Sequence, residues 1–262
     1  MIAGALVLLL FIILVWSIRP NPKRFKGFPV PLFAHRGLHD GTNPENSLAA
    51  FIRARQNNYG VELDVRLTAD KKLVVFHDDN LKRLCGEELS VCSLSYDELN
   101  RYRLSGTDQK IPLFEEVLKE LQGMPVICEI KSLPGEPVEE ICEAVCREVK
   151  GYPGFLCIES FNPFVLQWFR KNRSEFIRGQ LSMNFMKERD RLSFVKAFIM
   201  THLLVNVIGR PDFIAYRHTD DAAGFFLCRK IFRPVCAAWT VRGETELKHA
   251  RLKYQAIIFE ET

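Results

Sequence analysis

The sequence predicts an α/β fold, a (β/α)8 TIM barrel. About eight strand-like segments alternate with helix-like segments, a pattern that favours a parallel sheet with right-handed crossovers. The chain has 262 residues and 47% apolar content, which suits one core of barrel size. A doubly wound open sheet is the second choice, but the sequence contains neither the GxGxxG nor the P-loop motif of such folds.

The first eighteen residues carry no charged side chain and predict an N-terminal transmembrane helix. As a helix, residues 1–18 would span roughly 27 Å at about 1.5 Å per residue, close to the hydrocarbon thickness of a bilayer. Trp16 stands where an interfacial aromatic residue belongs, and basic residues follow it. This pattern favours a single-pass membrane anchor with a cytoplasmic catalytic domain. A cleaved signal peptide would need charge before the apolar run and a small-residue cleavage site after it.

Residues 19–31 predict a short, semi-stiff linker, because they hold four prolines. Its basic side chains suit anionic lipid headgroups. They are Arg19, Lys23, Arg24 and Lys26. The net charge of +4 is mild, and no Lys/Arg run is dense enough to indicate nucleic acid as a partner. The eight cysteines are scattered without a CxxC motif, so neither a zinc site nor a thioredoxin-like motif has support, and a reducing compartment is favoured.

The barrel is expected over residues 32–262. Its first strand covers 32–35, and the helix after it is expected to begin with Asn43 as cap and Pro44 in the first turn. Residues 85–110 do not fit the repeat and predict a small insertion after the second strand. Later strands are expected at 126–131, 155–159, 176–181, 212–216, 235–240 and 256–259, and helices at 113–121, 138–149, 163–171, 192–204, 220–231 and 244–252.

The second strand, Val61–Arg66, alternates strictly and places Glu62 and Asp64 on one face. Two neighbouring carboxylates repel each other and are costly to bury, so the pair indicates either half of a site for a hard cation or a polar strand face that meets solvent. Barrel enzymes carry catalysis at the carboxyl ends of their strands. The polar residues expected at those ends are His35, Arg36, His77, Asp78, Glu129, Lys131, Glu159, Ser160 and Thr240.

The motifs that contain these residues resemble those of the glycerophosphodiester phosphodiesterase family, in the family's order. Any one of them is weak alone, but six in order over 32–259 form a strong signal. They are His35-Arg36-Gly37, Glu45-Asn46-Ser47, Glu62-Leu63-Asp64-Val65, His77-Asp78, Glu129-Ile130-Lys131 and Trp239-Thr240-Val241.

The resemblance implies a cation site formed by Glu62, Asp64 and Glu129, which holds one calcium or magnesium ion. It also implies that His35 and His77 act as general acid and base. The implied reaction is metal-dependent hydrolysis of a glycerophosphodiester, through a cyclic phosphate, to glycerol 3-phosphate and an alcohol. Two alternatives stay open: a lysophospholipase D that acts on single-chain lipids, and a non-catalytic membrane-bound lipid sensor or scaffold.

Further residues have expected roles at the substrate. Arg36 is expected to clamp the phosphate bidentately, and Lys131 to act as a point charge. Trp239 either walls the glycerol pocket or packs in the core. Asp78 either supports His77 or is a turn residue, and Asn46 is expected to bond local backbone. Histidines expected on the surface are His39, His202, His218 and His249.

The sequence departs from the family pattern at its last strand. Phe259-Glu260-Glu261 stands where the family usually has a Thr-Asp pair before a proline, which puts the closing loop in doubt. The region 178–210 holds no family motif and is where substrate preference is expected to reside. Apolar residues there and nearby either pack in the core or line an acyl groove; they are Phe185, Phe194, Phe198, Ile199 and Leu203.

Overall fold

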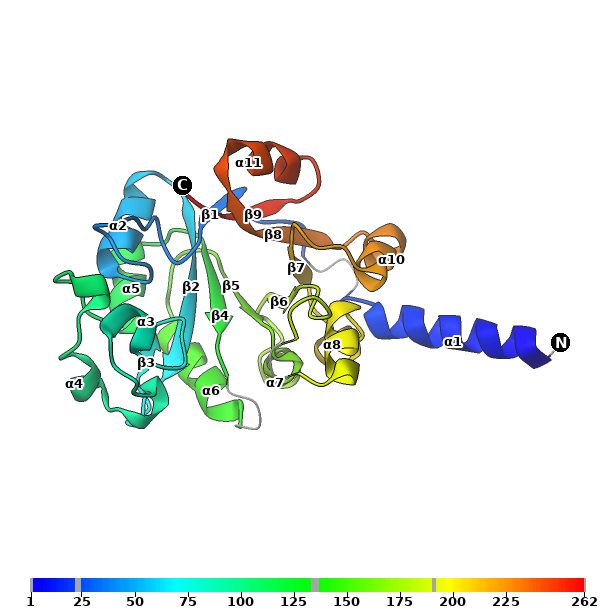
Figure 1. Cartoon of the computed structure of the whole chain (residues 1–262), viewed down its shortest axis with the longest axis horizontal. Helices are drawn as coiled ribbons and strands as arrows, with labels where there is room; N and C mark the ends of the chain where they lie inside the picture. Colours follow the sequence, from blue (N-terminus) through cyan, green and yellow to red (C-terminus); the bar gives the residue numbers. More distant parts are fainter. Residues whose placement is uncertain (1, 22–24, 133–136, 190–191, 262) are drawn as a thin grey trace.

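The computed structural model describes residues 2–21, 25–132, 137–189 and 192–261. Eight parallel strands close into a (β/α)8 barrel, which confirms the predicted fold (Figure 1). The first strand, β1, completes the ring, because it pairs with β2 on one side and with the last strand on the other. The barrel strands are β1 (Leu32–Ala34), β2 (Gly60–Leu67), β4 (Val126–Ile130), β5 (Leu156–Ser160), β6 (Arg178–Ser182), β7 (Phe213–Arg217), β8 (Val235–Arg242) and β9 (Ala256–Glu260).

Helices cover the outside of the barrel. They are α2 (Leu48–Gln56), α5 (Phe114–Leu121), α6 (Glu139–Glu148), α7 (Pro163–Asn172), α8 (Phe194–Thr201), α9 (Asn206–Gly209), α10 (Ala223–Phe232) and α11 (Gly243–Arg251). The predicted start at Asn43 and Pro44 is wrong. Ser47 caps α2 by accepting a hydrogen bond from the Ala50 amide, and Asn43 instead donates its amide to Asp40 in a turn.

The alternation of β2 separates two buried faces rather than a buried face and a wet one. Val61, Leu63 and Val65 point outward and pack beneath the helices. Glu62 and Asp64 point into the barrel and are almost fully buried. Parallel strands in such barrels are covered on both sides, so polar residues on the inner face have to find partners inside the barrel.

The insertion follows β3 (Leu73–Val75), which pairs antiparallel with β2. It contains α3 (Lys82–Cys85), η1 (Val91–Ser93), α4 (Tyr96–Leu99) and η2 (Leu104–Gly106). The insertion has an apolar cluster of its own, separate from the main core, and this cluster includes Leu84, Leu99 and Leu104. These contacts fix the position of the segment that leads out of β3 towards His77.

The first helix, α1 (Ile2–Ile18), extends away from the barrel (Figure 1). It has 17 residues, and within the described ranges no helix is both long and apolar enough to cross a membrane, so the predicted transmembrane helix is not supported. Its end is tied to α9, because the Asn206 amide donates to the Ile18 carbonyl and Arg210 donates to the carbonyls of Trp16 and Arg19.

Two aromatic rings of the linker, Phe25 and Phe28, cover the end of the barrel at which the strands begin. Phe25 stacks on Phe155, and Phe28 packs edge-on against Phe33 and Phe213. These partners lie at or beside the amino ends of their strands, opposite the end that carries the polar residues. The predicted basic residues Lys23 and Arg24 lie outside the described residues.

Candidate active site

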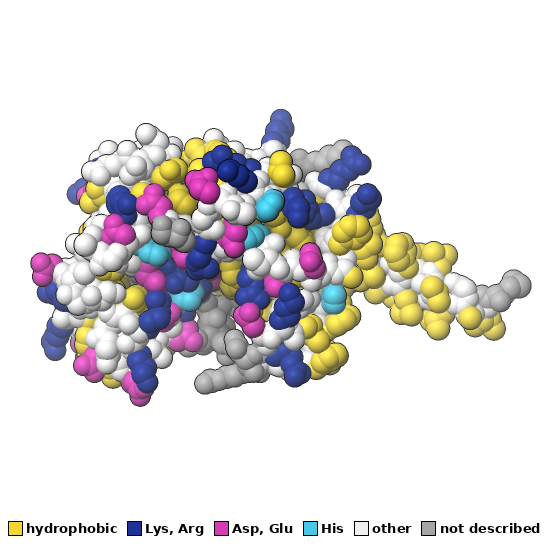
Figure 2. Space-filling view, turned by 45° about the horizontal axis from the view of Figure 1, so that its top comes forward, with side chains coloured by type: hydrophobic (Ala, Val, Ile, Leu, Met, Phe, Trp, Pro, Cys, Tyr) yellow, Lys and Arg dark blue, Asp and Glu magenta, His cyan; other side chains and the backbone are white. Residues whose placement is uncertain are grey.

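A cavity of ≈620 Å³ opens at the carboxyl ends of the strands. Figure 2 shows histidine, basic and acidic side chains gathered on this side of the molecule, in contrast to the apolar surface of α1. Among its lining residues are most of the predicted site residues: His35, Arg36, Glu62, His77, Glu129, Lys131 and Trp239.

The three predicted cation ligands converge. Glu62 and Asp64 lie on the inner face of β2, and the strand register places Asp64 directly beside Glu129 of β4. All three carboxylates are buried, and one oxygen of each lies within 4.8 Å of the others. This donor set consists entirely of hard oxygen ligands, so the residues present fit calcium or magnesium better than zinc.

Lys131 lies between the acids. Its Nζ is 3.0 Å from Asp64 Oδ1 and 2.7 Å from Glu129 Oε1. Burial lowers the pKa of Lys131, but the two carboxylates outweigh burial and hold that pKa above its usual value. For Glu62, burial raises the pKa well above its usual value, and repulsion by Asp64 and Glu129 adds to the effect. The carboxylates of this cluster therefore repel one another, and a bound cation would relieve that repulsion.

His35 is held from one side by a residue of the last strand. Its Nδ1 donates to Glu260 Oε1 at 2.6 Å, while its Nε2 faces the acids, 3.8 Å from Glu62 Oε2. Arg242 Nε donates to the other oxygen of Glu260 at 2.6 Å. Burial lowers the pKa of His35 to about 4, although the contact with Glu260 opposes the shift. The ring is therefore neutral at neutral pH, with one nitrogen oriented towards the cation site.

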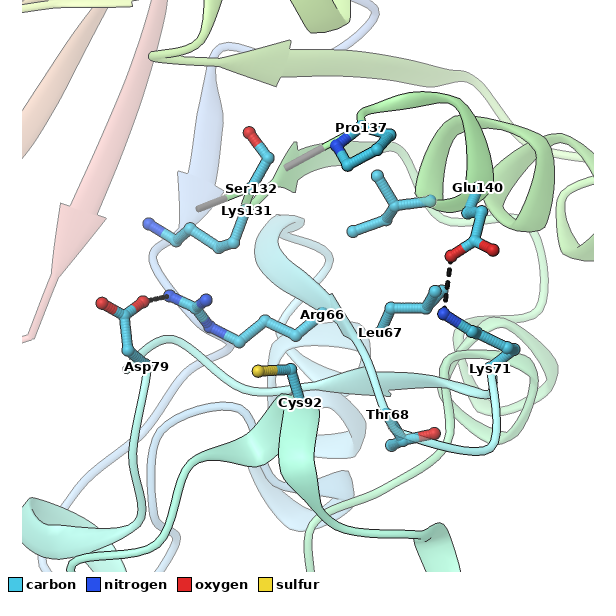
Figure 3. A pocket seen from close by; sticks show the side chains of 11 residues that line it. Arg66, Leu67, Thr68, Lys71, Asp79, Cys92, Lys131, Ser132, Pro137 and Glu140 are labelled. Atoms are coloured by element: carbon cyan, nitrogen blue, oxygen red, sulfur yellow. Dashed lines mark hydrogen bonds and ion pairs between the residues drawn. The ribbon is translucent and has the colours of Figure 1, made fainter. Parts of the chain in front are cut away.

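His77 has a similar arrangement in the segment after β3. Its Nδ1 lies 2.7 Å from Asp78 Oδ1, so Asp78 supports the ring rather than serving only as a turn residue. Arg83 of the insertion donates to Asp78 Oδ2 and to Glu45. Arg66 Nε and Nη2 both donate to the His77 carbonyl, at 3.0 and 2.6 Å. Arg66 also lines a second, smaller cavity of ≈250 Å³ beside the site (Figure 3).

Arg36 lies within the cation site rather than at its edge. Its backbone adopts φ 54°, which lets its amide donate to Glu62 Oε2 at 3.1 Å. Its guanidinium donates to Glu45 at 2.7 Å and lies 3.4 Å from Asp64. The expectation for Asn46 is wrong: its side chain donates to Asp64 Oδ2 at 2.8 Å instead of bonding local backbone.

The positions of Trp239 and of the histidines expected on the surface agree only partly with the predictions. Trp239 lines the cavity and packs edge-on against Phe161, with ring centroids 5.6 Å apart. His39 and His218 were expected on the surface but line the cavity. The residues considered for an acyl groove differ in exposure to solvent: Phe185 and Leu203 are buried, whereas Phe194 and Phe198 are exposed.

Two functional contacts were not predicted from the sequence: Glu260 binds His35, and Arg66 binds the His77 carbonyl. Glu159, which was expected at a strand end, lies buried beside Glu129 on the neighbouring strand. Burial and the charge of Glu129 raise the pKa of Glu159 well above its usual value. The one available signal was the position of Glu260 at the end of a strand, where a carboxylate faces the mouth of the barrel.

Comparison with known proteins identifies the family. The sequence matches the glycerophosphoryl diester phosphodiesterase family over residues 35–258. The chain belongs to this family. A glycerophosphodiester phosphodiesterase from Bacillus altitudinis is 42% identical over 238 residues, which cover 83% of this chain and 89% of the relative. A lysophospholipase D from Homo sapiens is 30% identical over 157 residues, 55% of this chain. The match spans about half (50%) of that relative's length.

Solved structures of similar proteins share the fold. A glycerophosphodiester phosphodiesterase from Thermotoga maritima has a TM-score of 0.67 at 26% identity, covering 88% of this chain and 95% of that one. A phosphodiesterase from Oleispira antarctica, solved with its product sn-glycerol-3-phosphate, has a TM-score of 0.72 at 24% identity. The match covers 88% of the present chain and 92% of the Oleispira antarctica protein.

Proposed function

We propose that this protein is a metal-dependent phosphodiesterase that hydrolyses glycerophosphodiesters to glycerol 3-phosphate and an alcohol. One observation carries the proposal: Glu62 and Glu129 of the buried acidic cluster line the same cavity as His35 and His77. The relative from Bacillus altitudinis, named a glycerophosphodiester phosphodiesterase, supports the substrate class.

The proposed cofactor is one divalent cation, calcium or magnesium, held by Glu62, Asp64 and Glu129. A cation bound there would neutralise a phosphodiester oxygen and stabilise the charge that builds on phosphorus. The charged side chains around this cation site set the net charge that the phosphate meets. Lys131 already neutralises Asp64 and Glu129 in part, and from the same position it would attract the anionic phosphate.

The two histidines divide the proton transfers. His35 is neutral, and its Nε2 faces the cation site, so we assign it as the base that takes the proton of the glycerol 2-hydroxyl. The alkoxide oxygen then bonds to phosphorus, and the bond to the leaving alcohol breaks. His77, whose ring is supported by Asp78, donates the proton that the alcohol needs. Water opens the cyclic glycerophosphate with the roles reversed.

The remaining site residues position the substrate. Arg36 is proposed to contact a phosphate oxygen, since its guanidinium lies beside Asp64 at the cation site. Trp239 and Phe161 form an apolar wall of the cavity on which the carbon face of glycerol can rest.

A panel of diesters tests the proposal. The full-length protein is incubated with glycerophosphocholine, glycerophosphoethanolamine and lysophosphatidylcholine, with calcium or with magnesium. We expect glycerol 3-phosphate from the first two substrates and none with the His35→Ala variant. Lysophosphatidic acid from the third substrate alone would favour the lysophospholipase D activity named for the human relative. A protein that leaves every diester intact with both cations would overturn the proposal and favour a lipid sensor.

We further propose that α1 attaches the enzyme to a membrane, with the barrel on the cytoplasmic side. Its apolar side chains are exposed along most of its length, Trp16 is near its end, and Arg19 follows. Flotation of the full-length protein with phosphatidylglycerol-containing vesicles tests this. We expect Leu6→Glu combined with Leu10→Glu to abolish flotation and leave the barrel folded; unchanged flotation would refute the attachment.

A further inference from the structure

A second group of potential metal ligands lies at the mouth of the barrel, apart from the acidic cluster. It consists of His35, His39 and Glu260, and one ligand atom from each lies within 4.8 Å of the other two. Glu260 Oε1 is shared: it is 2.6 Å from His35 Nδ1 and 3.9 Å from His39 Nε2. The Nε2 of His39 is buried and has no hydrogen-bond partner among the described residues.

The local backbone explains why the two histidines meet. Arg36 and Gly37 both have positive φ, at 54° and 81°, so the chain reverses directly after β1. A Cβ on Gly37 would lie 2.9 Å from Ala50, so the reversal depends on glycine at this position. The reversal carries His39 back over the end of β9, where Glu260 lies.

Two imidazoles and one carboxylate are the donor set of a borderline metal ion, as in His₂Glu zinc sites. The acidic cluster offers oxygen ligands alone. We propose that His35, His39 and Glu260 form a site for a transition-metal ion of the zinc class, and that an ion bound there inhibits the enzyme. The two sites share no ligand, so the protein can hold a hard cation and a zinc-class ion at once.

The position of the proposed site explains the inhibition. The two ring nitrogens of His35 face different groups: Nδ1 faces Glu260, and Nε2 faces the acidic cluster. An ion bound by Nδ1 and by Glu260 Oε1 replaces the hydrogen bond that orients the ring, and the proton of Nδ1 moves to Nε2, which can then no longer take the substrate's proton. It also adds positive charge beside the ring. Arg242 already holds Glu260 Oε2, so the carboxylate stays in place with Oε1 as its available ligand atom.

Metal binding and inhibition are separate claims. Binding depends only on the three side chains, whereas inhibition rests on the proposed phosphodiesterase function. The experiment therefore measures binding without turnover. Calorimetry with zinc chloride is performed on the full-length protein in excess calcium, which fills the acidic cluster. His39→Ala and His39→Gln are compared with His249→Ala, a change at an exposed histidine on α11.

We expect one zinc ion per chain in the wild type and in His249→Ala. Both His39 variants should bind zinc at least about tenfold more weakly, since even the loss of a partner outside the ligand set commonly weakens metal sites by about 10- to 100-fold. Equal zinc affinity in all proteins would overturn the site, whether or not the protein hydrolyses any diester.

The inhibition is tested with glycerophosphocholine as substrate. Zinc should inhibit the wild type and His249→Ala at the concentrations at which it binds, and added calcium should not relieve the inhibition. Full relief by calcium would show that zinc acts by displacing the ion from the acidic cluster, and it would overturn the inhibitory role of the second site.

Discussion

His35 Nδ1 and Glu260 Oε1 lie 2.6 Å apart, across the seam between β1 and β9. The two strands are neighbours in the barrel, and their register pairs Ala34 with Phe259. His35 follows Ala34 and Glu260 follows Phe259, so both side chains lie at the same place at the mouth of the barrel. Burial raises the pKa of Glu260, but the contacts with His35, His39 and Arg242 together outweigh burial and lower that pKa, so the carboxylate is ionised and acts as the acceptor. This contact decides which nitrogen of His35 faces the substrate.

Glu260→Gln should lower kcat by about 10- to 100-fold and change KM little. An amide can still accept the hydrogen bond from Nδ1, but it does not stabilise the charged imidazole that forms when His35 takes a proton. Steady-state kinetics with glycerophosphocholine at saturating calcium measure the effect.

Glu261→Gln is the matched control, because Glu261 is the neighbouring carboxylate and pairs with Arg53 instead. It should retain wild-type kinetics. If Glu260→Gln also keeps the wild-type kcat, the carboxylate has no positioning role.

Glu62→Gln should raise the Tm of the metal-free protein by about 2–4 °C at neutral pH while abolishing activity. The folded-state pKa of Glu62 is raised by burial and by Asp64 and Glu129, so its acid form is favoured by folding. That stability is present below the unfolded-state pKa and is lost as the pH rises, which makes Glu62 destabilising at neutral pH.

Calcium should raise the Tm of the wild type and have little effect on Glu62→Gln, because the cation loses a ligand. Differential scanning calorimetry with calcium and with a chelator measures both effects. Glu139→Gln, on the exposed face of α6, is the control and should behave like the wild type. A calcium-induced increase of equal size in the Glu62 variant would contradict the assigned cation site.

The sequence was sufficient for the barrel and for the acidic cluster, because both follow from local patterns. Strict alternation in β2 places Glu62 and Asp64 together, and strand order alone brings Glu129 beside them. The sequence was not sufficient to predict the role of Glu260, because its contact with His35 depends on the pairing of the first and last strands of the barrel. It also failed at the start of α2, where Asn43-Pro44 resembles a cap but is used in a turn with Asp40.

Asp212→Ala should destabilise the protein by about 3–5 kcal/mol without changing kcat. At the amino end of the barrel, Arg178 is buried, and its guanidinium lies 3.1 Å from Asp212 Oδ2, which also accepts the Arg178 amide. Removing the carboxylate breaks this buried ion pair and removes the acceptor of the Arg178 amide. Urea unfolding and steady-state kinetics separate the two effects. A drop in kcat for the folded variant would show that this end of the barrel contributes to catalysis.

Glu148→Gln should stabilise the protein more at pH 8 than at pH 4. Burial, with the charge of Glu115, raises the folded-state pKa of Glu148 to about 7, from 4.5 for the ordinary group. The acid form is favoured by folding, so wild-type stability is lost as pH rises through this window and the variant escapes the loss. After allowance for partial exposure, the gain is on the order of 1 kcal/mol. Urea unfolding across the pH range measures it; a gain independent of pH would contradict the assigned shift.

Arg66→Lys should lower kcat by about tenfold or more with little change in KM. Arg66 pairs with Asp79 at 2.6 Å (Figure 3). It also donates twice to the His77 carbonyl, so it fixes the segment that presents the proposed acid. Lysine keeps the charge but not the planar fork of donors, so the backbone of His77 gains freedom.

Lys71→Gln is the matched control for Arg66→Lys. Lys71 lines the same small cavity, but its ammonium pairs with Glu140 at 2.6 Å (Figure 3). Among the described residues, its ammonium has no ion pair or hydrogen bond with His35 or His77. It should retain wild-type kinetics. A parallel loss in both variants would mean that the cavity itself, rather than the Arg66–His77 contact, affects turnover. Wild-type kcat in Arg66→Lys would show that the position of His77 does not depend on the guanidinium.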